Sequence, residues 1–274
     1  PLVREVLLTE YAYPYRDPEN RSPAECAKAR VEEIEAKITT PELDGHVGML
    51  VAEPVQGEGG IIVPPKEFFP LLRKLCDDHG ILLIDDEVQA GMGRTGLLWG
   101  IDHWNTVPDL LVSGKALGGG LPLGGVTGPP RIMEAPGPAS LGGTFGGNPV
   151  VCAAALEAVK AIQTALPKVP RLEALIHTRL NEIYDRFERV GEVRGIGAMW
   201  ALEFVKDRGT KEPDPDIARA IQLGGLQHGL MLLTAGYSGN CVRLLPPLNI
   251  PLPLMERAFD RLEDTIAAAL KAAA

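Results

Sequence analysis

ILLIDDE, residues Ile81–Glu87, is a continuous apolar run that ends in acidic residues. A second apolar run with a polar end, DLLVSGK, follows at Asp109–Lys115. Continuous apolar runs that alternate with helical segments are typical of strands buried on both faces of a mostly parallel sheet. The pattern therefore predicts an α/β fold in which the ends of two strands bring an acid, Asp86, and an amine, Lys115, into one crevice.

The segments before and after these runs extend the same pattern. His46–Ala52 is a short apolar run, and Phe68–Gly80 carries helical periodicity. Together with the run that ends at Asp86, these segments predict a strand, a helix and a second strand in that order. A helix is expected to begin earlier, at Ser22, where serine, proline and a glutamate three residues on form a capping-box pattern. Gly124–Gly128 predicts one further strand.

The C-terminal part predicts a smaller domain of mixed strands and helices. Its expected strands and flanking helices are Gly197–Val205, Cys241–Leu245, Asp214–His228 and Pro253–Ala272. Prolines between residues 167 and 170 mark the boundary. We therefore expect a large α/β domain at residues 1–166 and a small α+β domain at residues 167–274.

Composition excludes several classes of function. The 274 residues are 45% hydrophobic and carry a formal net charge of −9, which indicates a globular chain without a broad basic surface for nucleic acid or anionic membrane. No uninterrupted apolar stretch approaches the roughly 18 residues of a membrane span. Because the chain begins at Pro1 rather than Met, we expect it to lack the N-terminal part of a longer protein.

The cysteines and histidines predict neither disulfides nor a metal site. The four cysteines are far apart and form no CxxC pair, which favours a reducing compartment, and we expect a cytoplasmic protein. The five histidines fall at no ligand spacing, so no metal is expected.

The placement of Lys115 and Asp86 indicates pyridoxal phosphate chemistry. A lysine after an apolar strand is expected to be partly buried, and the lost solvation would favour a neutral amine that can form an imine. A carboxylate on the neighbouring strand would keep a pyridine nitrogen protonated. Taken singly, an ordinary surface lysine and a charged strand end remain open alternatives.

The acidic strand end also resembles the magnesium-binding strand of nucleotide hydrolases. The corresponding phosphate loop is missing, since position 109 is Asp and Lys115 is followed by Ala116. Gly91–Gly96 matches the dinucleotide fingerprint but does not follow its strand directly. A magnesium-nucleotide ATPase module is therefore a distant alternative to pyridoxal phosphate chemistry.

Six motifs in order carry a more specific signal. They are EPVQGEGG at 53–60, DEVQAGMGRTG at 86–96, PD at 108–109, GKALGGGLP at 114–122, TFGGNP at 144–149 and RLLPPL at 243–248. This set resembles the class III pyridoxal-phosphate-dependent aminotransferases, the 4-aminobutyrate and acetylornithine group. The resemblance covers essentially the whole chain but only the later two thirds of the family's length, and it implies a fold-type I enzyme.

The resemblance assigns cofactor contacts to four residues. Lys115 would bond covalently to pyridoxal 5'-phosphate, Asp86 would pair with its pyridine nitrogen, and Gln89 would lie near its phenolic oxygen. Thr144 would reach the cofactor phosphate of the partner subunit, which implies a homodimer. The family's N-terminal phosphate-binding turn and ring-stacking aromatic residue lie outside this sequence.

The resemblance also assigns the substrate contacts. Arg243 resembles the clamp for a substrate α-carboxylate, and Glu53 resembles the acid that pairs with this arginine when an ω-amino donor is bound. A structural ion pair between the domains is the alternative for both. The implied reaction moves an amino group from an amino acid, including ω-amino acids such as 4-aminobutyrate, to a 2-oxo acid such as 2-oxoglutarate. An amino-acid racemase or epimerase of the same family would use the same Lys115 and Asp86, and these residues do not exclude it.

Overall fold

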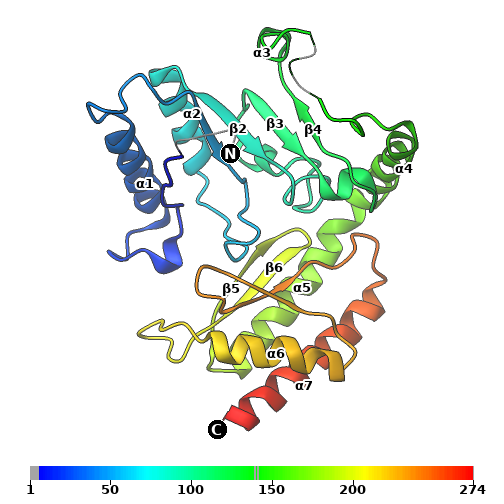
Figure 1. Cartoon of the computed structure of the whole chain (residues 1–274). Helices are drawn as coiled ribbons and strands as arrows, with labels where there is room; N and C mark the ends of the chain where they lie inside the picture. Colours follow the sequence, from blue (N-terminus) through cyan, green and yellow to red (C-terminus); the bar gives the residue numbers. More distant parts are fainter. Residues whose placement is uncertain (1–5, 139, 141, 274) are drawn as a thin grey trace.

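The first of two four-stranded sheets carries the predicted strand ends. The computed structural model describes residues 6–138, 140 and 142–273. The sheet has the order β1 (Met49–Ala52), β2 (Leu82–Asp86), β3 (Leu110–Ser113) and β4 (Gly125–Thr127) (Figure 1). β1, β2 and β3 are parallel, and β4 is antiparallel to β3. The predicted mostly parallel α/β sheet is confirmed.

Helices precede and connect these strands. Their bounds are α1 (Pro23–Ile38), α2 (Phe68–His79), α3 (Pro130–Met133) and the short 3-10 helices η1 (Pro14–Arg16), η2 (Gly100–Trp104) and η3 (Lys115–Gly118). The capping box predicted for α1 is present, because Ser22 accepts the backbone N–H of Glu25 and the Glu25 carboxylate accepts the backbone N–H of Ser22. Gly80 ends α2 with φ of +66°, a conformation that glycine adopts without steric cost.

The second sheet is antiparallel. Its order is β5 (Val190–Ile196), β6 (Met199–Phe204), β8 (Cys241–Leu244) and β7 (Leu233–Ala235). The helices α5 (Val169–Arg186), α6 (Pro215–Gln227) and α7 (Leu252–Ala273) pack with it around a second apolar core. Strands β6 and β8 match the sequence prediction, whereas β5 and β7 were not predicted, because glycine and charged residues in β5 hide its period and β7 has only three residues.

The predicted domain boundary falls in the 3-10 helix η4 (Leu166–Lys168), between α4 (Pro149–Ala165) and α5. The two sheets lie on either side of this point, and the division into two domains stays a prediction. The two sheets are also in contact, because Met199, Ala201 and Cys241 of the second sheet belong to the core cluster of the first.

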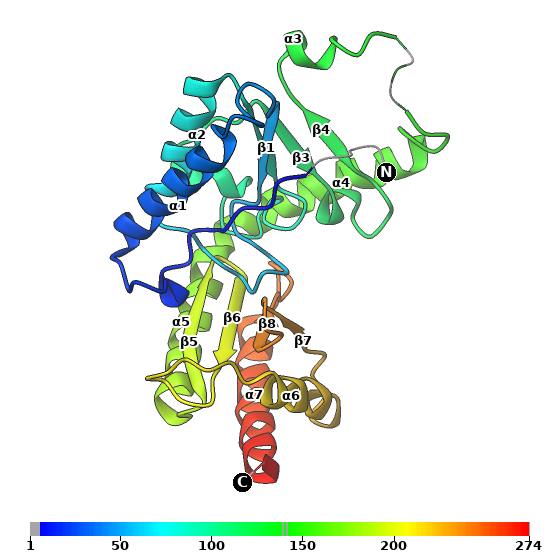
Figure 2. The same cartoon turned by 60° about the vertical axis from the view of Figure 1, so that its left-hand side comes forward.

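The N-terminal segment joins both sheets. It runs from the first sheet to η1 beside β5 and β6 (Figure 2). The hydroxyl of Tyr11 donates to the backbone oxygen of Glu53 at 2.7 Å, and Arg16 pairs with Glu203 of β6. These contacts hold the loop after β1 against the second sheet.

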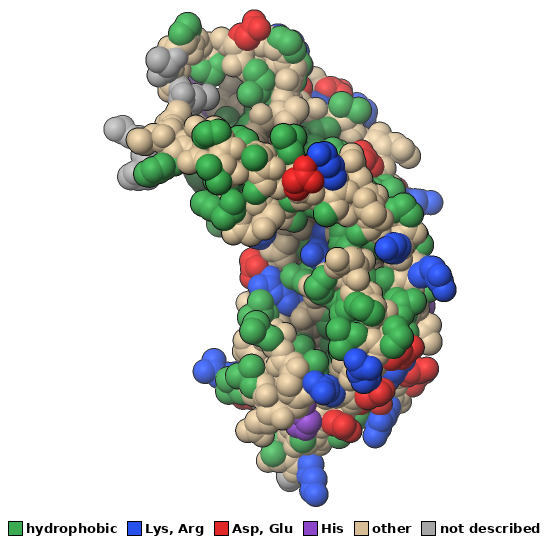
Figure 3. All heavy atoms as spheres, turned by 90° about the vertical axis from the view of Figure 1, so that its right-hand side faces the viewer, with side chains coloured by type: hydrophobic (Ala, Val, Ile, Leu, Met, Phe, Trp, Pro, Cys, Tyr) green, Lys and Arg blue, Asp and Glu red, His purple; other side chains and the backbone are tan. Residues whose placement is uncertain are grey.

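Helix α4 has an apolar, exposed surface. Val150 and Leu156 are 72% and 64% exposed, and hydrophobic side chains gather over the upper half of this face of the molecule (Figure 3). By length and composition alone, the helical stretch Pro149–Arg186 could cross a membrane. Within α4, Glu157 and Lys160 form an exposed ion pair at 2.7 Å.

Candidate active site

Two adjacent parallel strands end at the same edge of the first sheet. Asp86 closes β2 opposite Val112 of β3, and the next backbone N–H, that of Glu87, donates to the Val112 oxygen at 2.9 Å. Lys115 follows Val112 by three residues, at the start of η3. The carboxyl edge of a parallel sheet is where open α/β folds bind ligands. The acid and the amine thus extend from neighbouring strand ends.

Lys115 has an unusual backbone conformation. Its φ is +44°, in the left-handed region that lysine rarely adopts, and it follows the extended Gly114. Its side chain is exposed, so the partial burial expected from the apolar strand is wrong for this chain. The reason is that the chain leaves the sheet at Gly114, and the residues of β3 before it are only half-buried apart from Ser113.

Arg243 lies in β8 and faces a loop of the first sheet. One of its terminal nitrogens, Nη1, pairs with the carboxylate of Glu58, and Nη1 also lies 3.5 Å from the side-chain oxygen of Gln89. Gln89 in turn donates to Glu58 at 3.3 Å. Three polar side chains from β8, the loop after β1 and the segment after β2 therefore meet in one cluster.

Glu53 does not pair with Arg243. Its carboxylate accepts the backbone N–H of Gly57 at 2.9 Å and so turns into its own loop, while Glu58, five residues later, faces the arginine. In this structure Arg243 thus pairs with Glu58, and the pairing of Glu53 with Arg243 when an ω-amino donor is bound stays a prediction. Both glutamates belong to the quoted motif EPVQGEGG, and the motif alone gives no signal for choosing between them.

The pKa values of both glutamates respond to the charge of Lys115. Burial raises the pKa of Glu53, Asp86 adds to the rise, and the Lys115 ammonium opposes it. The hydrogen bond from Arg243 lowers the pKa of Glu58, burial opposes this, and Lys115 contributes to the lowering. The charge of Lys115 thus favours the ionised form of both carboxylates.

Two further groups have unmet hydrogen-bonding capacity. The Arg243 side chain is 13% exposed, and its Nε has no hydrogen-bond partner among the described residues. The same is true of both carboxyl oxygens of Asp85, which lies next to Asp86 and is 1% exposed. A buried donor without an acceptor is costly, so Arg243 is suited to receiving an anionic group.

Asp85 forms a buried acid pair with Glu87. Burial raises the pKa of Asp85 to about 9, and the neighbouring Glu87 carboxylate adds to the rise. Burial also raises the pKa of Glu87, and the backbone N–H of Ile101, which donates to Glu87 at 2.8 Å, opposes that rise. The raised pKa of Asp85 favours its protonated form at neutral pH. Glu87 is 1% exposed, and its Oε1 accepts the N–H of Ile101.

Thr144 lies apart from the cluster. It is exposed in the turn before Asn148, whose side chain caps α4 by accepting the N–H groups of Val150 and Val151. Within the described part of the chain, no hydrogen bond joins Thr144 to any of the other predicted site residues. Its predicted role across a subunit boundary stays a prediction.

Comparisons with known proteins fit this arrangement. The family model for aminotransferase class-III matches residues 1–266. A 4-aminobutyrate aminotransferase of Mycobacterium leprae is 40% identical over 95% of this chain, and a leucine/methionine racemase of Thermococcus litoralis is 38% identical over 92% of it. The chain spans 59% and 57% of these two relatives.

A solved structure supports the same assignment. The PLP-bound amine transaminase from an uncultivated Pseudomonas species is 33% identical, with a TM-score of 0.87 over 95% of this chain and 61% of its own. The chain has the mostly parallel sheet of a fold-type I α/β protein. On this evidence, the chain belongs to the class-III aminotransferase family.

Proposed function

We propose that the protein is a pyridoxal-phosphate-dependent aminotransferase that transfers an amino group from an amino acid, including ω-amino acids, to a 2-oxo acid such as 2-oxoglutarate. Two observations support the proposal: Asp86 and Lys115 follow the ends of adjacent parallel strands, and Arg243 of the second sheet pairs with Glu58 in the loop after β1. Similarity to a 4-aminobutyrate aminotransferase supports the choice of substrates.

The residues present fit the cofactor. Asp86 is half-buried and uses one carboxylate oxygen, Oδ1, to accept the N–H of Val88 at 3.0 Å, which fixes its orientation. Lys115, Asp86 and Gln89 would hold the cofactor, with Thr144 reaching the cofactor of the partner subunit. When bound, pyridoxal phosphate supplies an aldehyde for an amine and a ring that accepts electron density from the substrate carbon.

Lys115 transfers the proton, and Asp86 stabilises a positive charge on the ring. The amine nitrogen of Lys115 removes the proton from the substrate carbon that bears the amino group, and later gives a proton back. The Asp86 carboxylate stabilises a protonated ring nitrogen through its negative charge. Burial raises the pKa of neighbouring Asp85 to about 9, which favours a neutral group beside Asp86 at this strand end.

Arg243 and Glu58 handle the substrate carboxylate. An α-carboxylate would bind the Arg243 guanidinium through two parallel hydrogen bonds, one of them from the buried Nε. Glu58 neutralises the arginine when a donor has no carboxylate at that position. Glu58 thus takes the role that the resemblance had assigned to Glu53.

Replacement of Lys115 tests the proposal. In the full-length protein, Lys115→Ala should abolish both the visible absorbance of bound cofactor and amino transfer. Lys66→Ala is a matched control, because Lys66 is a surface lysine of the same part of the chain, with a side chain 89% exposed. Retention of activity by Lys115→Ala, or loss in both variants, would contradict the assignment.

An amino-acid racemase is the second candidate, supported by the 38% identity to the leucine/methionine racemase. It needs the same acid and amine but returns the proton to the carbon from which it came. The full-length protein should therefore be incubated with single amino acids in the absence of any 2-oxo acid. Stereoinversion under these conditions would favour the racemase, whereas dependence on an acceptor favours transamination.

We also propose a cytoplasmic homodimer. Exposed apolar side chains surround the turn that carries Thr144, since Phe145 is 84% exposed and Val150 follows at the start of α4. Burial of such a surface against a second copy would favour association. The four cysteines are free, which agrees with a reducing compartment. Sedimentation of the full-length protein tests the dimer.

A further inference from the structure

One buried arginine of the second sheet holds the loop that carries Glu58. Arg194 lies in β5 and is 9% exposed. Its Nε and Nη2 both donate to the backbone oxygen of Gly60, at 2.9 and 2.6 Å. Gly60 follows Glu58 by two residues, so Arg194 contacts the backbone of this loop rather than the glutamate side chain.

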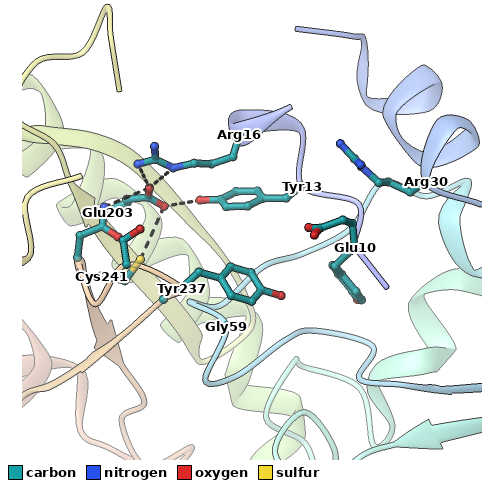
Figure 4. A pocket seen from close by; sticks show the side chains of 12 residues that line it. Glu10, Tyr13, Arg16, Arg30, Gly59, Glu203, Tyr237 and Cys241 are labelled. Atoms are coloured by element: carbon teal, nitrogen blue, oxygen red, sulfur yellow. Dashed lines mark hydrogen bonds and ion pairs between the residues drawn. The ribbon is translucent and has the colours of Figure 1, made fainter. Parts of the chain in front are cut away.

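Arg194 is itself fixed by carboxylates. Its Nη1 lies 2.6 Å from both Glu192 and Glu203. Glu203 also accepts hydrogen bonds from Tyr13 and Arg16, and the three side chains line a pocket of 140 Å³ (Figure 4). Because the guanidinium is planar and its donors have fixed directions, these contacts leave Arg194 one orientation toward Gly60.

The backbone at Gly60 packs closely against Arg194 and Gly236. Gly60 has φ of +117°, and a Cβ at this position would lie 2.9 Å from the arginine Nη2 and 3.1 Å from the Cα of Gly236. Gly236, in the second sheet's loop after β7, donates its N–H to the backbone oxygen of Glu58 at 2.9 Å. Atoms of the second sheet and its loop therefore hold the backbone on both sides of Gly59.

The side chain of Glu58 lacks comparable support. It is 69% exposed, and within the described residues its partners are Arg243 and Gln89. An exposed ion pair contributes little when its side chains are free to move, because holding them together costs conformational entropy. The strength of the Glu58–Arg243 pair thus depends on how firmly the backbone beneath Glu58 is held.

We propose that Arg194 is a positioning residue that sets the strength of the Glu58–Arg243 pair and thereby the preference between ω-amines and substrates with an α-carboxylate. The inference rests on the proposed aminotransferase function. With the loop held, Glu58 neutralises Arg243 and an ω-amine is accepted. With the loop released, Arg243 is more often free, which favours substrates that carry an α-carboxylate.

The test compares Arg194→Lys with Arg208→Lys in the full-length, cofactor-loaded protein. Lysine keeps the charge near Glu203 but cannot make both bonds to Gly60. Arg208 is a matched control because it also donates to backbone oxygens, including that of Val190 at 2.9 Å, but does not contact the Glu58 loop. Arg194→Lys should lower the ratio of kcat/KM for 4-aminobutyrate to that for L-glutamate about tenfold.

Two further results separate positioning from general destabilisation. The KM for 2-oxoglutarate should fall in Arg194→Lys, whereas a merely structural defect would not lower it. In a Glu58→Gln background, Arg194→Lys should leave the ratio of kcat/KM for 4-aminobutyrate to that for L-glutamate unchanged, because the ion pair on which it acts is already absent. Equal losses for both donors, or a shift that persists without Glu58, would overturn the proposal.

Hydrogen exchange gives a readout independent of activity. The backbone N–H groups of Gly60 and Ile62, which are bonded within the loop, should exchange faster in Arg194→Lys than in the wild type or Arg208→Lys. Unchanged exchange would refute the role of Arg194. Faster exchange in a protein without aminotransferase activity would instead refute the proposed function and leave the loop contact intact.

A second variant covers the case in which Arg194→Lys does not fold. Glu192→Gln removes one of the two carboxylates on Arg194 and leaves Glu203 in place. The ratio of kcat/KM for 4-aminobutyrate to that for L-glutamate should fall about threefold in this variant, as expected for loss of one part-exposed charged contact. A ratio equal to that of the wild type would count against the proposal.

Discussion

Glu58 and Arg243 form an ion pair between the loop after β1 and strand β8, so the pair joins the two sheets. The two partners differ in environment, because the glutamate side chain is 69% exposed and the arginine side chain 13% exposed. A fixed cation with a displaceable counter-ion can accept substrates both with and without a carboxylate. Under the proposed function, the choice of amino donor would depend on this one contact.

Replacement of each loop glutamate tests which of them carries this function. Glu58→Gln should lower kcat/KM for 4-aminobutyrate about tenfold and lower the KM for 2-oxoglutarate, because Arg243 loses its counter-ion. Glu53→Gln should change both half-reactions alike, since Glu53 bonds to Gly57 instead. Steady-state kinetics with both substrates measure the difference. A selective shift in Glu53→Gln alone would restore the role first assigned to Glu53.

Asp85 should make stability depend on pH. Its pKa is raised to about 9 in the folded chain, chiefly by burial, whereas an aspartate in an unfolded chain titrates near ~4. Between these values the folded state holds a proton that the unfolded state has lost, so stability should fall as pH rises through this window. Asp85→Asn removes the titrating carboxyl group at nearly constant volume and should flatten the dependence of stability on pH.

Thermal unfolding between about pH 5 and pH 9 checks this prediction, and the two profiles should diverge by roughly a few degrees across the range. Asp44→Asn is the matched control, since Asp44 is an exposed aspartate in the turn before β1. A profile that stays as steep in Asp85→Asn as in the wild type would show that Asp85 is ionised in the folded chain.

The sequence could predict the sheet because its strands are continuous apolar runs with acidic or basic ends. The same pattern could not predict β5, in which Arg194 bonds to the Gly60 loop and Glu192 holds Arg194. Buried charge is a tertiary property, since Arg194 needs the carboxylate of Glu203 from another strand before it can leave water. Residues of this kind have no local pattern that identifies them.

The candidate site shows a similar limit. Strand order follows from the motifs, so the neighbourhood of Asp86 and Lys115 was predictable. The choice between Glu53 and Glu58 was not, because it depends on how the segment 57–60 turns, and a side chain at Gly57 would overlap the amide of Gln89. The exposure of Lys115 follows from the path of the chain after Gly114 and not from the apolar character of β3.

Thr144 should affect cofactor retention only in an assembled dimer. Thr144→Val removes the hydroxyl at nearly constant volume and should raise the dissociation constant of pyridoxal phosphate about tenfold, because a hydrogen bond to a charged phosphate is lost. Thr127→Val, at an exposed position in β4, is the control. Equilibrium dialysis of the full-length protein measures the constant, and equal retention by both variants would contradict a phosphate contact.

The cap of α4 links this turn to stability. Asn148 accepts the N–H groups of Val150 and Val151 at 3.0 and 3.3 Å, so Asn148→Ala leaves two donors of the first helical turn without that acceptor. The loss should lower the free energy of unfolding by about 1 kcal/mol, and Asn148→Asp should recover most of it, since a carboxylate also caps a helix and favours its positive end. Urea unfolding measures both variants.

Because Thr144 lies four residues before the cap, Asn148→Ala should also weaken cofactor retention. A change in stability without any change in retention would show that the turn is positioned by other contacts.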